Sequence, residues 1–307
     1  MNLTLLLANL VLALAVAPLL NGVIKKSKAG WQNRCGPGVL QPWFDIWKYL
    51  GRESVVSEHA SWLFRLAPYV YFGAHLAAAG MVPMVLVGSP LAGMGDVIVL
   101  VGLLALARFA LALAALDTAS NFGGMGTSRE LAFASLVEPA LFLALFSLAI
   151  PVGSTALGAL VGDGGVTVAR LLALGVFFIV AVAETGRIPV DNPDTHLELT
   201  MAHEGMLLEY SGRPLGLLLW GTHIKQLVIL SLLAALFFPW GIASDPSAAS
   251  LAVGMLTYLA KLGLLGLALA LVETTNVKMR IFRVPDLLGA ASLLGLLAIT
   301  SIYVVGG

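Results

Sequence analysis

Long apolar runs separated by short polar segments dominate this chain. Crossing the hydrocarbon core of a bilayer takes about 20 predominantly apolar residues in a helix, because every backbone amide must be satisfied within the segment. The pattern therefore predicts an all-α, polytopic membrane protein of about eight transmembrane helices. The predicted spans are residues 3–24, 66–87, 97–116, 131–152, 166–183, 215–240, 251–272 and 287–305, and 166–183 is the shortest.

A different pattern follows the first run. Apolar side chains at positions 39, 40, 43, 44, 46, 47 and 50 recur at helical spacing, while Gln41, Asp45, Lys48 and Arg52 mark the opposite face. An amphipathic helix rich in tryptophan is typical of a segment that lies in the membrane interface. A simple lipid anchor explains this pattern, and so does the rim of a cavity entered through the turn at 36–38.

Composition supports one membrane domain. Hydrophobic residues make up 59% and charged residues 11% of the 307 residues, and the mean hydropathy is +0.95. A soluble domain carries roughly 25% charged residues. We therefore expect a single transmembrane helical domain over residues 1–307, with no separate soluble domain.

Basic residues concentrate in every second loop. The positive-inside rule then predicts that these loops face the cytoplasm and that both termini lie outside. No basic residue precedes the first run, so we interpret it as a retained helix and not a cleaved signal peptide. The basic positions are Lys25, Lys26, Lys28, Arg34, Lys48, Arg52, Arg65, Arg129, Arg187, Arg213, Lys278, Arg280 and Arg283, and Arg170 is the exception.

Cysteine and histidine usage limits the cofactors. Cys35 is the only cysteine, which excludes an internal disulfide and a cluster held by four thiolates of this chain. Only His75 and His223 lie within predicted spans, so a b-haem quinol oxidase subunit with paired intramembrane histidines is disfavoured.

Ionisable residues interrupt the apolar runs. An isolated charge at mid-membrane costs about 3 kcal/mol, so such groups usually face a bundle interior or a water-filled path. Structural ion pairs are the alternative. For Glu138, which precedes the helix-breaking Pro139, and for Lys225 we favour function. The charges within the runs are Arg108, Glu138, Lys225 and Lys261, and those near their ends are Asp117, Glu130, Glu184 and Glu273.

An acidic segment follows the run at 166–183. Six carboxylates occur between positions 184 and 209, and Asp191, Asp194 and Glu198 would share a face if helical. Stacked carboxylates repel one another, and Arg187 is the nearest countercharge in sequence. A solvated acidic loop is the alternative, but proline and apolar neighbours favour a proton relay.

At these places the sequence resembles the membrane-anchor subunit shared by respiratory complex I (its subunit 1) and the energy-converting, group 4 nickel–iron hydrogenases. Residues 184–191 read ETGRIPVD and residues 209–212 read EYSG, the most specific signature of that family. The resemblance spans nearly the whole chain, including the helix count and orientation.

Two details of the resemblance favour the hydrogenase branch. Residues 34–42 (RCGPGVLQP) resemble the compact hydrogenase form of this loop, and residues 128–130 (SRE) followed by Glu138-Pro139 resemble formate hydrogenlyase and hydrogenase-4 subunits. The sequence departs from complex I at Val190, Asp194 and His196, where that family has Phe, Glu and Glu. Those changes argue against a complex I-like quinone chamber.

The resemblance implies a non-catalytic coupling subunit of an oxidoreductase complex in a prokaryotic inner membrane. That complex would move protons or sodium ions. It implies as partners the hydrogenase large and small subunits, an iron–sulfur subunit and antiporter-like membrane subunits, without nucleic acid. The nickel–iron centre and iron–sulfur clusters would belong to those partners, with no metal or cofactor in this chain. The implied relay residues are Glu130, Glu138, Glu184, Arg187, Asp191, Asp194, Glu198 and Lys225, and the docking residues are Arg34, Gln41, Asp45, Arg129, Glu209 and Tyr210.

Two other functions remain open. A quinone-site subunit of a complex I-type NADH:quinone oxidoreductase is nearest. A secondary ion transporter also buries charge, but it predicts inverted repeats with matched broken helices, which the sequence does not display.

Overall fold

The computed structural model describes residues 3–87, 95–162, 165, 167–191, 201–243, 245 and 247–305. Within those ranges the chain is helical, and its β-structure is limited to two isolated bridges, Leu86–Ala243 and Asp96–Ala156. The elements are α1 (Leu3–Trp31), α2 (Gln41–Leu50), α3 (Trp62–Met81), α4 (Val97–Asp117), α5 (Asn121–Val152), α6 (Leu157–Leu160), α7 (Val168–Glu184), α8 (His203–Leu207), α9 (Gly212–Phe237), α10 (Ala248–Thr275), a 3₁₀ turn η1 (Ile281–Arg283) and α11 (Val284–Val305).

The all-α, polytopic fold predicted from the sequence is confirmed, and the count of eight spans is approximate. Each predicted run overlaps one long helix, and these helices are α1, α3, α4, α5, α7, α9, α10 and α11. Among the described residues, six segments are long and apolar enough to cross a membrane. The helix α7 is shorter, at 17 residues, and α3 carries Arg65 and His75.

Two helices extend far beyond the apolar runs that predicted them. α1 continues to Trp31 and α5 begins at Asn121, so Lys28 and Glu130 stand on helices and not in loops. Ser120 caps α5 by accepting a hydrogen bond from the Gly123 amide. Hydropathy detects only the part of a helix that matches lipid, whereas helix formation tolerates charged residues well.

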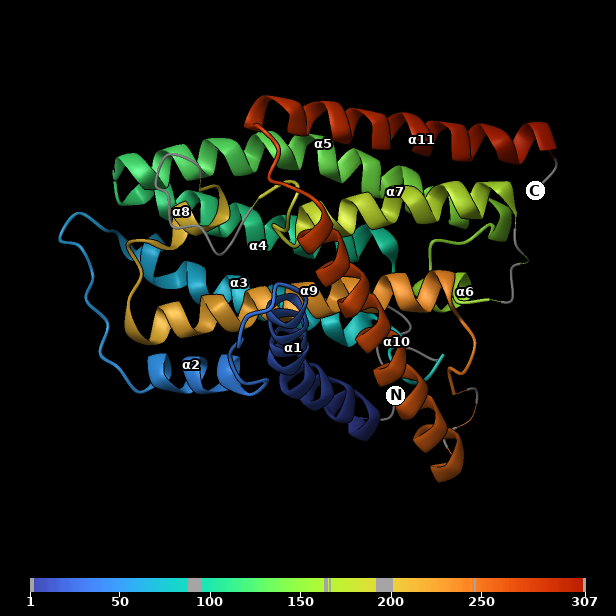
Figure 1. The fold of residues 1–307 in the computed structure, drawn as a ribbon, viewed down its shortest axis with the longest axis horizontal. Helices are drawn as coiled ribbons and strands as arrows, with labels where there is room; N and C mark the ends of the chain where they lie inside the picture. The colour runs from blue at the N-terminus through green and yellow to red at the C-terminus, as the bar shows by residue number, and fades with distance from the viewer. Residues whose placement is uncertain are drawn as a thin grey trace.

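The long helices form one bundle in which α9 is central. In Figure 1, α1 and α10 cross obliquely, whereas α3, α4, α5, α7, α9 and α11 run roughly along the long axis. α9 contacts α1, α2, α3, α7 and α10, and its residues from Ile224 to Phe237 are all buried. A charged residue in this stretch, such as Lys225, therefore lies in the protein interior.

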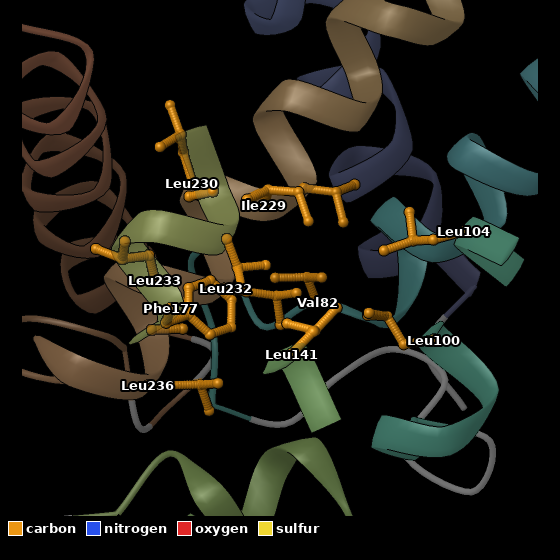
Figure 2. Close-up of a cluster of buried hydrophobic side chains, with 14 of the residues drawn as sticks. Val82, Leu100, Leu104, Leu141, Phe177, Ile229, Leu230, Leu232, Leu233 and Leu236 are labelled. Atoms are coloured by element: carbon orange, nitrogen blue, oxygen red, sulfur yellow. The ribbon is translucent and has the colours of Figure 1, made fainter. Parts of the chain in front are cut away.

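Apolar side chains fill the centre of this bundle. Figure 2 shows leucines of α9 gathered with Leu141 of α5, Phe177 of α7 and Leu100 of α4. Lipid is as apolar as leucine, so helix association in a bilayer depends on close packing and polar contacts. Buried alanines at the contacts, including Ala107, Ala140 and Ala173, let the backbones approach.

Backbone contacts tie the loops together at the two ends of the bundle. At one end, the Val87 amide donates to the Ala243 carbonyl and the Leu157 amide donates to the Gly95 carbonyl. At the other end, Ser211 exchanges two hydrogen bonds with the backbone of Val55, and Met279 N donates to Pro189 O. The latter end carries the basic segments, as their alternation along the sequence predicts, and its cytoplasmic location stays a prediction.

The amphipathic helix after the first span is present as α2. It runs beside the N-terminal half of α9 (Figure 1), with Ile46 buried while Phe44 and Trp47 are exposed. The Trp43 ring meets the Trp220 ring edge-on at 5.4 Å between centroids. Its position in the membrane interface stays a prediction.

Candidate functional site

Arg108 of α4 is the centre of a buried ion network. Its guanidinium donates to Glu138 of α5 at 2.5 Å and to Glu184 of α7, and its Nε lies 3.8 Å from Glu130 of α5. Arg108 is only 7% exposed. The carboxylates offset the cost of placing a guanidinium inside an otherwise apolar helix.

Glu184 connects Arg108 to a second cation. Its Oε1 accepts from Arg108, and its Oε2 lies 2.9 Å from Nζ of Lys225 on the central helix α9. The network therefore joins four helices and contains three carboxylates and two cations. Each charge has a partner of opposite sign, as buried ions require.

A small cavity extends this network toward the end of the bundle that carries the basic segments. Its volume is about 60 Å³, which leaves room for several water molecules. It joins the ion network to Asp191. The polar side chains lining it are Glu130, Glu184, Thr185, Asp191, His203, Glu204, Thr222 and Lys225.

Arg187 forms a separate network on the other side of the α7 terminus. Its guanidinium donates to Glu273 of α10 at 3.1 Å, to Asn21 of α1 at 2.7 Å and to Gln226 of α9 at 3.0 Å. Lys28 of α1 lies 3.4 Å from the same Glu273. Among the described residues, the main countercharge of Arg187 is thus Glu273, and an effect of Arg187 on the acidic segment stays a prediction.

The described part of the acidic segment ends at Asp191. Its Oδ1 accepts from Lys278 at 2.7 Å, and its Oδ2 accepts from the Ala202 amide at 3.3 Å. A cation that follows α10 therefore holds this carboxylate. Asp194 and Glu198, the other predicted relay residues of the segment, lie outside the described residues, as does His196.

Most predicted docking residues lie near the surface. Arg34 and Glu209 are exposed, Gln41 donates to Asp45 at 2.9 Å along α2, and Arg129 donates to the Met201 carbonyl at 2.8 Å. Their contact with a partner stays a prediction.

Tyr210, also expected at the docking face, is a core residue and only 4% exposed. Its ring stacks on Phe64 at 3.9 Å between centroids, and its hydroxyl donates to the Phe64 carbonyl at 3.0 Å. Burial raises the pKa of this phenol. Tyr210 therefore presents no docking surface in this chain, and it joins the loop before α9 to α3.

Several members of these networks have no role in the expectations from the sequence, among them Arg108, Glu273 and His203. Arg108 and Glu273 stand out as charges in or near apolar runs, which is the available signal, but their partners are distant in sequence. His203 gives no signal of its own, since only the fold brings it to the cavity. Among the described residues, no group of three or more His, Cys, Asp or Glu side chains could hold a metal ion.

The fold that holds this buried network belongs to a known family of membrane proteins. The NADH dehydrogenase family model matches residues 3–305, so the chain belongs to that family. It is 39% identical to formate hydrogenlyase subunit 4 of Escherichia coli (strain K12), over 94% of both chains. It is also 39% identical to hydrogenase-4 component C of the same organism, over 89% of this chain and 87% of that one.

More distant similarities agree with this assignment. An H-type subunit of the NADH-quinone oxidoreductase of Symbiobacterium thermophilum is 29% identical over 71% of both chains. A chain of the membrane-bound sulfane sulfur reductase, an archaeal respiratory membrane complex, superimposes with a TM-score of 0.82 at 22% identity, over 96% of this chain and 97% of that one. The latter likeness establishes the fold.

Proposed function

We propose that this chain is the membrane-anchor and coupling subunit of an energy-converting respiratory hydrogenase complex. It docks a peripheral redox module and links electron transfer in that module to movement of protons or sodium ions. Two relatives named as formate hydrogenlyase and hydrogenase-4 subunits, each 39% identical over most of both chains, support the hydrogenase branch.

The redox chemistry in this proposal belongs to the partners. The nickel–iron centre and the clusters reside in the hydrogenase large and small subunits and in an iron–sulfur subunit, and antiporter-like membrane subunits stand beside this chain. The module docks at the end that carries the basic segments, which faces the cytoplasm of a prokaryotic inner membrane. This chain supplies charge and proton-exchanging groups beneath the module.

One observation carries the proposal: ionisable groups connect continuously from Glu138 on α5, through Arg108 and Glu184, to the cavity that reaches Asp191. Unit charges 4 Å apart interact by about 4 kcal/mol at an effective dielectric constant of 20. A change of charge at Asp191 therefore acts on the charged groups that line the same cavity.

The test compares amide substitutions in the assembled complex. Glu138→Gln, Glu184→Gln and Asp191→Asn keep the side-chain shape but remove charge and proton exchange. Each variant is expected to retain hydrogenase activity with an artificial electron-carrying dye. In vesicles each loses ion translocation driven by the natural reaction.

The matched control is Asp286→Asn, an exposed carboxylate in the first turn of α11 that lies outside the networks. It is expected to translocate like the parent. If the three network variants assemble and translocate at the parental ion-to-electron ratio, the carboxylates are structural and the coupling proposal fails. If this chain is purified in mild detergent and no hydrogenase subunit copurifies with it, the anchor role is contradicted.

A quinone-site subunit is the second candidate, favoured by the similarity to the NADH-quinone oxidoreductase relative. In that case the purified complex reduces an added short-chain quinone at the expense of NADH. In the hydrogenase complex proposed here, hydrogen turnover proceeds without added quinone.

A further inference from the structure

His75 of α3 lies beside the ion network with one ring nitrogen available. It is 1% exposed, and its Nδ1 lies 2.9 Å from the Tyr71 carbonyl. A carbonyl only accepts, so Nδ1 carries the proton and Nε2 is a bare acceptor. Among the described residues, no atom hydrogen-bonds Nε2.

A cavity of about 10 Å³ adjoins His75. Holding one water takes about 10 to 15 Å³ and two to four polar partners, so this cavity fits one molecule. Its polar lining is Tyr71, His75, Arg108, Glu130, His203 and Lys225, and Leu104, Leu111 and Met206 close it.

The hydrogen bonds of Thr222 settle which groups can serve that water. The Thr222 hydroxyl donates to the Leu218 carbonyl at 3.0 Å, so its oxygen accepts from the Tyr71 hydroxyl at 3.1 Å and from His203 Nε2 at 3.3 Å. The Tyr71 proton is thus committed to Thr222. Donors and acceptors for the water then come from the charged network and from His75 Nε2.

We propose that one ordered water in this cavity hydrogen-bonds His75 Nε2 and makes His75 the inner proton-accepting end of the network. This inference rests on the proposed function. Once a proton from the docking end has been delivered to the Glu130 carboxylate, the neutral carboxyl gives that proton to the water while the water gives a proton to Nε2. The products are the Glu130 carboxylate and an imidazolium whose Nδ1–H still donates to Tyr71.

The path ends at His75, because the next residues inward are apolar. Ala78 and Ala79 of α3 and Leu104 of α4 are buried within the hydrophobic core. His75 therefore stores a proton and returns it to the network. In this role His75 differs from the carboxylates of the network, which transfer protons from one group to the next.

Several charged groups act on the His75 proton. Burial, Arg108 and Lys225 disfavour the imidazolium, whereas Glu130 and Glu184 favour it, and the side chains of His203 and Tyr71 face the same cavity. Protonating a carboxylate of the network removes one favourable charge. The proton on His75 consequently responds to the state of the docking end.

The experiment uses the complex purified through a tag on this chain, with His75→Gln and His75→Phe. A structure that resolves waters should show one density about 3 Å from Nε2 in the parent and none in the phenylalanine variant. Glutamine keeps a hydrogen-bonding group but takes no proton. In vesicles His75→Gln is expected to lower translocation per electron about 100-fold or more, the lower end of the loss when acid–base assistance is removed, and to flatten its dependence on pH.

Met255→Leu, a volume-conserving change on α10 outside this cavity, is the control and translocates like the parent. An unoccupied cavity in the parent, or parental translocation by His75→Gln, overturns the inference. If Glu184→Gln is defective while His75→Gln is normal, the proposed function stands without a role for His75. If neither variant is defective, both proposals fail.

Discussion

The indole N–H of Trp220 donates to the Leu14 carbonyl at 3.2 Å. Leu14 stands four residues before Pro18, and both lie within α1. Proline has no N–H, so it leaves the carbonyl four residues earlier without its helical partner. Trp220 of α9 therefore replaces the hydrogen bond that Pro18 removes.

The same relationship occurs at a second proline. Pro68 lies inside α3, and the carbonyl four residues before it belongs to Phe64. That carbonyl accepts the Tyr210 hydroxyl at 3.0 Å. A carbonyl exposed to hydrocarbon costs several kcal/mol, so both aromatic donors make an intrahelical proline tolerable in a membrane. They also join α9 and the segment before it to α1 and α3.

Trp220→Phe tests the first pair. Phenylalanine keeps an aromatic ring beside Trp43 and Phe72 but leaves the Leu14 carbonyl without its donor. The expected loss of stability is about 0.6 to 1.7 kcal/mol, the range of polar interhelical contacts in membranes. The midpoint of thermal unfolding of the purified complex measures it.

Pro18→Ala provides the decisive control for that pair, because alanine restores an N–H that can donate to Leu14. In the Pro18→Ala background Trp220→Phe is expected to cost less. Equal costs in both backgrounds would show that Trp220 acts through packing alone. Tyr303→Phe, at an exposed position, should leave the midpoint unchanged.

The positions of the spans follow from the sequence because the bilayer selects them by hydropathy alone. The amphipathic helix α2 is equally local, since its faces are defined by spacing within ten residues. The interior charges are visible as interruptions of apolar runs. Hydropathy therefore predicts the positions of the buried charges along the chain.

Partners of those charges do not follow from the sequence, because they depend on how helices cross. Arg187 pairs with Glu273, 86 positions away, whereas proximity in sequence suggested the acidic loop. Tyr210 was expected at a docking surface because it belongs to a polar motif. Its role needs Pro68, which lies more than a hundred residues earlier, and only packing brings them together.

Gly22 of α1 marks a close approach of two backbones. A Cβ built on it lies 1.9 Å from the Val39 carbonyl oxygen, so Gly22→Ala forces α1 away from the segment before α2. Gly30→Ala in the same helix meets nothing within 4 Å. We expect Gly22→Ala to lower the yield of folded complex, with Gly30→Ala at or above the parental level. Comparable amounts of folded complex for both variants would show that the backbone at Val39 can move aside at little cost.

Cys35 provides a natural probe of orientation, because it is the only cysteine and is exposed near the basic end of α1. A membrane-impermeant maleimide should label it in inside-out vesicles and not in intact cells. A cysteine introduced by Ala248→Cys in a Cys35→Ser background, at the opposite end of the bundle, should show the reverse. Labelling after solubilisation establishes that neither site is covered by a partner. Labelling of Cys35 from outside would invert the proposed topology.

Arg187→Lys separates the charge of Arg187 from its geometry. The guanidinium holds α1, α9 and α10 to the turn after α7 through Asn21, Gln226 and Glu273. Lysine keeps the charge but lacks the planar fork that serves three acceptors. Arg187→Lys should therefore lower the unfolding midpoint less than Arg187→Met, which removes the main partner of the buried Glu273 and leaves only Lys28 of its two ion-pair partners among the described residues.

The double variant Arg187→Met with Glu273→Gln decides between this explanation and simple packing. Removing both charges leaves no buried carboxylate without its main partner, so the double variant should be more stable than Arg187→Met alone. Lys28 loses a contact in that variant, but it stands nearer the surface, with its side chain 12% exposed. Because this network is separate from Arg108, dye-linked hydrogenase activity and translocation per electron should recover together with stability. If Glu273→Gln worsens Arg187→Met, the two side chains act independently and Arg187 is held by other contacts.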